Sequence, residues 1–266
     1  MSRADASGLP SLSLKISVIT AVFNRRDTVA DAIQSIQKQT YDHIEHVVQD
    51  GGSQDGTLKV LGDHSNANTL LVSAPDSGIY DAINKGIKRA TGDVVGLMHS
   101  DDYFASDSVL EKVATAFRDP DVDGVYGDLQ YVSAIAPEKI VRHWESGDYD
   151  PDLLKRGWMP PHPTLYLRTG VFERLGLYDT SYRIAADYDA MLRYLVRGQI
   201  KLAYIPEVLV KMRVGGVSNR SLRHIIQKSR EDYRAIRTNE IGGIGTLMMK
   251  NFSKVRQFVK SGNQKY

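Results

Sequence analysis

The chain has 266 residues, of which 42% are hydrophobic and 25% are charged, so its composition is that of a globular protein and excludes wholesale disorder and fibrous repeats. Lys and Arg number 34 against 32 Asp and Glu, and the net charge of +2 gives no indication of a nucleic-acid partner. The chain contains no Cys, which excludes disulfides, thiolate metal sites and a Cys nucleophile and fits a reducing, cytoplasmic compartment.

Residues 1–13 are small and polar and lack the apolar core of a signal peptide, so we expect a disordered leader there. No apolar run in the chain is long enough to span a bilayer, so we expect no transmembrane helix. Any membrane association should therefore be peripheral, at the inner face of the membrane.

The first part of the chain alternates apolar strand patterns with amphipathic helix patterns. Strands are predicted at residues 16–23, 44–49, 69–73 and 94–98, and helices at 27–39, 58–61, 80–89 and 108–117. This alternation is typical of βαβ units. We therefore predict the α/β class, with a Rossmann-like, mostly parallel sheet flanked by helices.

The second part is less regular. We predict strands at residues 124–132 and 164–167, a helix at 187–196, and one or two short strands within 200–212, around Pro206. No linker or internal repeat separates the two parts. We expect one domain at residues 14–219, followed by a helical extension at 220–266.

Polar side chains follow the predicted strands of the first part: Asn24, Asp50, Asp76 and the adjacent Asp101 and Asp102. The carboxyl ends of parallel strands meet at one edge of a sheet, and ligands bind at that edge. Adjacent ionised carboxylates repel each other, and a hard divalent cation such as Mn²⁺ or Mg²⁺ relieves that cost. The alternative is that the Asp pair satisfies backbone donors ahead of the next helix.

The common phosphate-binding motifs are missing from the sequence. It has no P-loop, and no G-x-G-x-x-G follows the first predicted strand. Nucleotide binding would therefore use acidic groups. Asp50 and Asp76 suit this role because ionised carboxylates accept hydrogen bonds from base N–H groups and ribose hydroxyls.

Five blocks of the sequence resemble the motifs of family 2 glycosyltransferases and occur in the family's order. They are similar to the opening strand, the second-strand motif, the third block, the D-x-D-type metal motif and the later E-D-Y-D-type block: Ser17–Asn24, Val47–Thr57, Asp76–Gly86 with Ala90–Asp93, His99–Asp102, and Ala186–Asp189. Together they cover about residues 15 to 215.

The resemblance implies a GT-A fold, with a nucleotide-binding half at about residues 14–104 and an acceptor-binding half at about 105–219. It implies a metal-dependent, inverting transfer of a hexose-type sugar from a nucleotide diphosphate sugar, most often a UDP-sugar. The acceptor would be a hydroxyl of a glycan or a lipid-linked molecule, as in cell-surface polysaccharide biosynthesis.

Residue roles follow from the resemblance by position. The expected nucleotide-binding residues are Ala21, Asn24, Asp50, Asp76, Ser100 and Asp101. Asp102 would bind the metal, with Asp101 on the ribose or the metal, and Asp187 would be the general base.

Asp187 has alternatives. Inversion in one step needs a single base that takes the proton of the acceptor hydroxyl, and no covalent nucleophile. Asp187 could instead be an N-cap, and Asp189 could be a solvated partner of Arg193 four residues on. The family usually has an acidic residue before this Asp, and Ala186 stands there instead.

Four further residues are candidates for the site. Arg213 resembles a block, continuing to Ser218, that closes over the diphosphate; the alternative is a surface Arg beside a turn. Trp158 and His162 lie in a Pro-rich loop that suits contact with a sugar or acceptor; the alternative is a packed Trp in a connection. Lys85 is also expected to line the site.

The charge is unevenly distributed. Residues 220–266 carry 11 Lys or Arg and three acids, a local +8, which leaves −6 for residues 1–219. Apolar residues recur at helical spacing from Ile244 to Val259, and Lys250 is among the cations expected on the other face. A basic amphipathic helix suits an anionic membrane surface, and packing on its own domain or a partner is the alternative.

Two other functions compete with sugar transfer. A sugar-phosphate nucleotidyltransferase would share the sheet and the metal, but it predicts a Gly-rich loop after the first strand, which residues 21–26 lack. A non-catalytic sugar-nucleotide-binding subunit is disfavoured because Asp101, Asp102 and Asp187 are all present.

Overall fold

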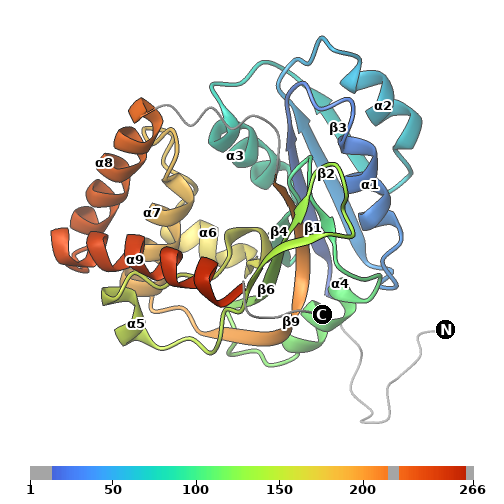
Figure 1. The fold of residues 1–266 in the computed structure, drawn as a ribbon. Helices are drawn as coiled ribbons and strands as arrows, with labels where there is room; N and C mark the ends of the chain where they lie inside the picture. Colours follow the sequence, from blue (N-terminus) through green and yellow to red (C-terminus); the bar gives the residue numbers. More distant parts are fainter. Residues whose placement is uncertain (1–13, 215–221, 262–266) are drawn as a thin grey trace.

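The computed structural model describes residues 14–214 and 222–261. The predicted leader, the end of the block at Arg213–Ser218 and the last residues of the tail lie outside this part. Its strands form one sheet with the order β3-β2-β1-β4-β8-β6-β9-β5, and β7 pairs with β6 (Figure 1).

In the first half, helices and strands alternate as predicted. The strands are β1 (Ile16–Val22), β2 (Ile44–Asp50), β3 (Thr69–Ser73) and β4 (Val94–Leu97), and the helices are α1 (Val29–Gln37), α2 (Thr57–His64), α3 (Ile79–Arg89) and α4 (Val109–Ala116). The strands β1 to β4 pair in parallel, with Val22 opposite Asp50 and Asp50 opposite Ser73. Their carboxyl ends therefore meet at one edge, as the sequence predicted.

The second half makes the sheet mixed. It contains β5 (Tyr103–Phe104), β6 (Gly124–Ser133), β7 (Ile140–Trp144), β8 (Tyr166–Arg168) and β9 (Leu202–Val214). β8 is antiparallel to both β4 and β6, whereas β6 is parallel to β9. The sheet is thus parallel from β3 to β4 and changes direction at β8. The short β5 and β7 were not predicted.

The segment around Pro206 forms one long strand. Gly127 pairs with Ile205 and Asp128 with Val208, so Pro206 lies in a bulge of β9. A bulge tolerates proline because no ladder N–H is required there.

The helices of the second half are shorter than those of the first. They are α5 (Pro151–Lys155), the 3₁₀ turn η1 (His162–Thr164), α6 (Thr169–Leu175), α7 (Ala186–Leu192) and the π-helical turn η2 (Arg193–Arg197). The helix predicted at 187–196 is α7 together with η2. The segments α5, η1 and α6 were not predicted.

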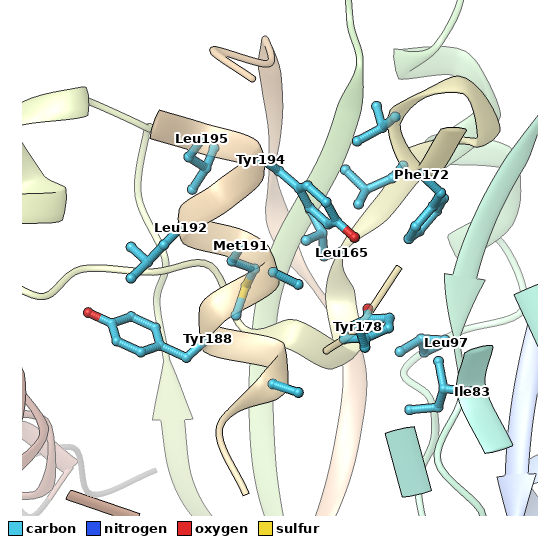
Figure 2. Close-up of a cluster of buried hydrophobic side chains, with 14 of the residues drawn as sticks. Ile83, Leu97, Leu165, Phe172, Tyr178, Tyr188, Met191, Leu192, Tyr194 and Leu195 are labelled. Atoms are coloured by element: carbon cyan, nitrogen blue, oxygen red, sulfur yellow. The ribbon is translucent and has the colours of Figure 1, made fainter. Parts of the chain in front are cut away.

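Two apolar layers cover the two faces of the sheet. In β1, Ile16 and Val18 point toward α1 and α4, whereas Ile19 points toward α3. Figure 1 shows α1 and α2 on one side of the sheet and α3, α6 and α7 on the other. Figure 2 shows the second layer, in which Met191 of α7 lies among buried aromatic and aliphatic side chains.

The tail forms two helices, α8 (Leu222–Thr238) and α9 (Ile244–Ser261). They lie beyond α7 as an outer layer (Figure 1). Ala235, Ile236 and Ile241 are buried in the same apolar cluster as α7. Part of the tail therefore packs on its own domain. None of the described helices is long and apolar enough to cross a membrane.

The prediction for Lys250 was wrong. It was placed on the polar face of the helix, but its side chain is only 1% exposed. Its ammonium lies 2.7 Å from Asp232 Oδ1 of α8 and 3.1 Å from the centre of the Tyr188 ring of α7. A buried ammonium needs such partners because its desolvation is otherwise costly. Lys250 therefore ties α9 to α8 and α7.

Candidate functional site

A cleft of about 580 Å³ opens at the carboxyl edge of the parallel strands. It is lined by residues from the ends of β1, β2 and β4 and from the start of α3: Ala21, Val22, Phe23, Arg25, Gly51, Asp76, Gly78, Ile79, Ala82 and Ser100. Three of the predicted nucleotide-binding residues, Ala21, Asp76 and Ser100, are among them. A cleft at this edge of a parallel sheet is where ligands bind in such folds.

Asp76 is part of the wall of the cleft. Its Oδ1 accepts a hydrogen bond of 2.9 Å from the N–H of Gly78. A Cβ on Gly51 would lie only 2.5 Å from Asp76 Oδ2, so a glycine at this position lets the carboxylate approach the backbone. The geometry presents an acceptor carboxylate at the cleft wall.

Asp50 and Asn24 shape the loops around the cleft. The carboxylate of Asp50 is fully buried and accepts hydrogen bonds from Gly52, Ser53 and Ser73 at 2.5 to 3.4 Å. Asn24 has a left-handed backbone (φ 51°), which Asn tolerates well, and its Oδ1 accepts the N–H of Gln54 at 3.0 Å. Both side chains are thus engaged within the protein, and their contact with a nucleoside stays a prediction.

Lys85 is also engaged within the protein. Its ammonium lies 2.9 Å from Asp81 Oδ2 and donates to the carbonyl of Pro75 at 3.0 Å. These contacts hold the loop that leads into α3. Lys85 is not among the residues that line the cleft, and its predicted contact with the nucleotide stays a prediction.

Asp102 is a buried carboxylate with one unsatisfied oxygen. It is 1% exposed, and its Oδ1 accepts the backbone N–H of Arg213 at 3.1 Å. Its Oδ2 is buried and has no hydrogen-bond partner among the described residues. Burial and the neighbouring Asp101 raise the pKa of Asp102 well above its usual value, and Arg213 partly opposes them. A divalent cation would supply a partner for Oδ2, so the pair Asp101–Asp102 fits a metal.

The rest of the described chain does not supply a complete set of protein ligands. Within residues 14–214 and 222–261, no group of three or more His, Asp or Glu side chains could hold a metal ion. Mg²⁺ and Mn²⁺ are commonly bound by one or two carboxylates together with substrate phosphates and water. The Asp pair fits that mode of binding.

Arg213 is paired in the structure. Its guanidinium lies 2.5 Å from Asp31 of α1, donates to the carbonyl of Asp101 at 3.2 Å, and lies 4.9 Å from the centre of the Tyr103 ring. It thus links α1 to the Asp101–Asp102 turn. A role on a diphosphate would require it to exchange partners, and it stays a prediction.

Asp187 lies in the first turn of α7, across from α3. Its Oδ1 is 3.1 Å from the hydroxyl of Tyr80, which is also 2.7 Å from the carbonyl of Ile184. Burial and the negative charge of Asp187 raise the pKa of Tyr80, so this hydroxyl stays protonated and can donate. The carboxylate of Asp187 is therefore oriented by a helix of the nucleotide-binding half.

Asp189 has a different environment. It is 4% exposed, lies 3.6 Å from Arg193, and accepts a hydrogen bond of 2.9 Å from Asn239 Nδ2. The predicted pairing with Arg193 is confirmed, but the carboxylate is buried rather than solvated. Asp189 is a structural link between α7 and α8, which leaves Asp187 as the candidate base.

His99, in the predicted metal motif, and His162 lie close to each other. The rings of His99 and His162 are 6.1 Å apart, and His162 Nε2 lies 2.9 Å from the hydroxyl of Tyr178. Burial lowers the pKa of both, to about 4 for His162. The charges of Asp101 and Asp187 both act on His99, in the direction that raises its pKa. The metal motif and the candidate base therefore act electrostatically on one imidazole.

Trp158 is packed on both sides. Its ring stacks on Tyr149 with centroids 5.4 Å apart, meets Tyr126 edge-on at 5.8 Å, and its Nε1 donates to the carbonyl of Ser146 at 2.9 Å. This arrangement matches the alternative of a packed Trp. Contact with a sugar stays a prediction.

Sequence reasoning did not single out Tyr178, Asn84 or Glu231. Asn84 of α3 exchanges two hydrogen bonds with the backbone of Tyr178, of 2.8 and 3.0 Å, and so aligns the partner of His162. Glu231 contacts the backbone ahead of α7. Each contact joins segments distant in the sequence, and no local pattern signals them.

Comparison with known proteins places the chain among sugar-transferring enzymes. The model of glycosyl transferase family 2 matches residues 17–171. An uncharacterised glycosyltransferase of Mycobacterium tuberculosis is 30% identical over 183 residues, which cover 67% of this chain and 68% of that protein. A PGL/p-HBAD biosynthesis glycosyltransferase of Mycobacterium bovis is 29% identical over 208 residues, which cover 76% of this chain and 78% of that protein.

Solved structures show the same fold at low identity. A mannosyltransferase of Pyrobaculum calidifontis in complex with GDP-Man and Mn²⁺ has a TM-score of 0.65 at 17% identity, over 97% of this chain and 78% of that chain. S. aureus TarS 1-349 in complex with UDP-GlcNAc has a TM-score of 0.65 at 17% identity, over 85% of this chain and 65% of that chain, so this chain spans less than two thirds of that fragment. The predicted α/β GT-A fold is confirmed.

Proposed function

The chain belongs to glycosyltransferase family 2, and we propose that it transfers a sugar from a nucleotide diphosphate sugar to a hydroxyl group with inversion at the anomeric carbon. The observation that supports this best is the cleft at the carboxyl edge of the parallel strands, which Asp76, Ile79 and Ser100 line. Asp101 and Asp102 directly follow Ser100, and Tyr80, which contacts Asp187, directly follows Ile79, so a donor in the cleft would have both the proposed metal-binding pair and the proposed base nearby.

Asp187 is the proposed general base. As the acceptor hydroxyl attacks the anomeric carbon, its proton passes to the Asp187 carboxylate, and the nucleoside diphosphate leaves from the opposite face. The Tyr80 hydroxyl at 3.1 Å holds the carboxylate in orientation. One in-line displacement inverts the centre and requires no covalent intermediate.

Asp102, with Asp101, is the proposed metal-binding pair, and Mn²⁺ or Mg²⁺ is the proposed ion. The buried, unpartnered Oδ2 of Asp102 supports this assignment. When bound, the ion would stabilise the negative charge of the leaving diphosphate. Asp76 would accept hydrogen bonds from the nucleoside, and the backbone N–H groups around Gly51 would donate hydrogen bonds to it.

The proposed donor is a UDP-sugar, a class represented by the UDP-GlcNAc in the TarS complex. The test is a panel of UDP-GlcNAc, UDP-glucose, UDP-galactose and GDP-mannose, each with Mn²⁺ or EDTA, with release of the nucleoside diphosphate as the readout. We expect release from a UDP-sugar that requires the metal, with an inverted product. Release of pyrophosphate would identify a nucleotidyltransferase, and tight binding without turnover would identify a binding subunit.

The acceptor is proposed to be a glycan or lipid-linked molecule used in cell-surface polysaccharide biosynthesis, with the enzyme held at the inner face of the membrane. Ile244, Met248 and Phe252 form a stripe on α9 and are 63%, 56% and 69% exposed. An exposed apolar stripe on a basic tail supports contact with an anionic lipid surface.

The membrane contact is tested by point substitutions. Met248→Ser with Phe252→Ser should weaken binding to vesicles rich in acidic phospholipid. Ile135→Ser, which alters an apolar residue that is 95% exposed elsewhere, is the matched control and should not. Equal binding of both variants would contradict a membrane role for this stripe.

A further inference from the structure

The backbone just ahead of the candidate base is held by one side chain of the tail. Glu231 Oε2 of α8 accepts hydrogen bonds from three successive N–H groups, those of Arg183, Ile184 and Ala185, at 3.1, 2.8 and 3.0 Å. Asp187 follows two residues later. One carboxylate oxygen therefore fixes the segment from which the base projects.

A second helix holds the same segment from the other side. The hydroxyl of Tyr80 of α3 lies 2.7 Å from the carbonyl of Ile184 and 3.1 Å from the Asp187 carboxylate. The backbone of Ile184 is thus bound at its N–H by Glu231 of α8 and at its carbonyl by Tyr80 of α3. With both contacts in place, movement of Asp187 relative to the cleft requires a hydrogen bond to break.

The carboxylate of Glu231 is itself held in place. Its other oxygen accepts a hydrogen bond of 3.0 Å from Gln227. Burial alone raises the pKa of Glu231, but the hydrogen bonds from Ile184, Gln227 and the neighbouring backbone outweigh it and leave the pKa below its usual value. The group is therefore ionised near neutral pH, and its bonds to N–H groups are charge-assisted.

The helix that carries Glu231 is anchored to the rest of the domain. Asp232 pairs with the buried Lys250, Arg234 donates to Ser181 at 2.9 Å, and Asn239 donates to Asp189 at 2.9 Å. These three contacts, made by residues that follow Glu231, hold the second part of α8 and its end against α7, α9 and the segment before α7. A rigid support is what a positioning group needs in order to fix another side chain.

We propose that Glu231 is a positioning residue for sugar transfer: by binding the N–H groups of residues 183–185, it fixes the orientation of the Asp187 carboxylate. This inference rests on the proposed function, because it assigns to the tail a role in orienting the proposed base. It gives the C-terminal helices a part in the chemistry that is independent of any membrane.

The test compares Glu231→Ala and Glu231→Gln with Glu240→Gln, a matched control that removes an exposed acid from the turn that follows the same helix. The readouts are hydrogen exchange of the amides at 183–185, the Kd for the donor that turns over in the panel above, and kcat. We expect faster exchange at these amides and a kcat lower by about 10-fold or more for Glu231→Ala, with an unchanged donor Kd. Glu231→Gln, which keeps an acceptor without the charge, should lose less, and Glu240→Gln should behave as the parent.

A folded Glu231→Ala protein with parental kcat or parental exchange at 183–185 overturns the proposal. So does an equal loss in donor binding and kcat, which would indicate general unfolding. If Glu231→Ala does not fold, the same readouts on Glu231→Gln decide.

The Asp187→Asn background separates this proposal from the proposed function. If Glu231 acts through Asp187, Glu231→Ala costs little more activity in that background. An equal loss in both backgrounds overturns the positioning role. If Asp187→Asn alone keeps the full rate, the base assignment fails instead, whatever Glu231 does.

Discussion

The two halves of the candidate site are held in place by different kinds of contact. In the first half, the buried carboxylate of Asp50 binds Gly52 and Ser53, two and three residues away. In the second half, the segment before Asp187 is held by Glu231, 46 to 48 residues away, and Asp187 by Tyr80, 107 residues away. The edge that is proposed to bind the nucleotide is held largely by contacts within the first half, whereas the candidate base depends on distant helices.

This difference has a functional meaning. Local contacts form wherever the βαβ unit forms, so the cleft is expected to be preformed for the donor. The candidate base has its observed orientation only when α3, α7 and α8 are assembled around it. Donor binding and catalysis should therefore respond differently to substitution, and four predictions examine this separation.

The largest effect is expected for Asp187→Asn. An amide cannot take the proton of the acceptor, so kcat should fall by about 10²–10⁴-fold while the donor Kd stays the same. Steady-state kinetics and a donor titration measure the two quantities. Loss of donor binding in parallel with kcat would break the separation between the halves.

Lys250→Met should have the next largest effect, on stability. Without Lys250, the buried carboxylate of Asp232 loses its buried ammonium and keeps the part-exposed one of Lys228, so the free energy of unfolding in urea should fall by about 2–3 kcal/mol. Lys228→Met is the control: it pairs with the same Asp232 but is 39% exposed, so the loss should be below about 1 kcal/mol. The double variant Lys250→Met with Asp232→Leu should recover most of the loss, and equal effects of the two single lysine variants would refute the buried pair.

Asp102→Asn and Asp50→Asn should change the free energy of unfolding in opposite directions. In metal-free protein, Asp102→Asn relieves a buried carboxylate with an unpartnered oxygen and should raise the free energy of unfolding by about 1–2 kcal/mol. Asp50→Asn disrupts a fully hydrogen-bonded carboxylate and should lower it by about 1–3 kcal/mol. Denaturant unfolding with EDTA measures both. A loss of stability in Asp102→Asn would argue against an unsatisfied carboxylate there.

The smallest effect is expected for the pH dependence of stability that His46, in the first half, causes. Burial lowers the pKa of His46 from 6.5 to about 4, so the folded protein keeps this ring neutral. The stability from neutral His46 is present above pH 6.5 and is lost as the pH falls toward 4, by about 1 kcal/mol between pH 6.5 and 5.5. His46→Asn should flatten this slope, whereas the exposed His43→Asn should not, and identical slopes in urea unfolding would contradict the assignment.

The predictability of the fold follows the same division. Residues 16–98 show continuous apolar runs at the strands and a period of 3.6 at the helices, and the predicted strand at 69–73 matches β3 at both ends. The unpredicted β5 has only two residues, and β7 pairs with β6 alone, so neither leaves a strong pattern. The proline that suggested two strands at 200–212 lies instead in a bulge of one strand.

The site divides in the same way. The blocks that resemble the family motifs contain Ala21, Asp76, Asp102 and Asp187, so the resemblance alone predicts them as site residues. Glu231 lies in a basic segment, where the adjacent acids Glu231 and Asp232 look like surface charges. Only the folded structure shows that Glu231 contacts the three N–H groups ahead of α7.

The buried pair Asp232–Lys250 also sets an order in time. Domains fold as the chain is synthesised, N-terminal parts first, so the cleft at the carboxyl edge of β1, β2 and β4 can form before α9 has been synthesised. Until Lys250 emerges, the charge of Asp232 has no ammonium from α9, and α8 lacks this anchor. A nascent chain should therefore be able to hold its donor before it can use it.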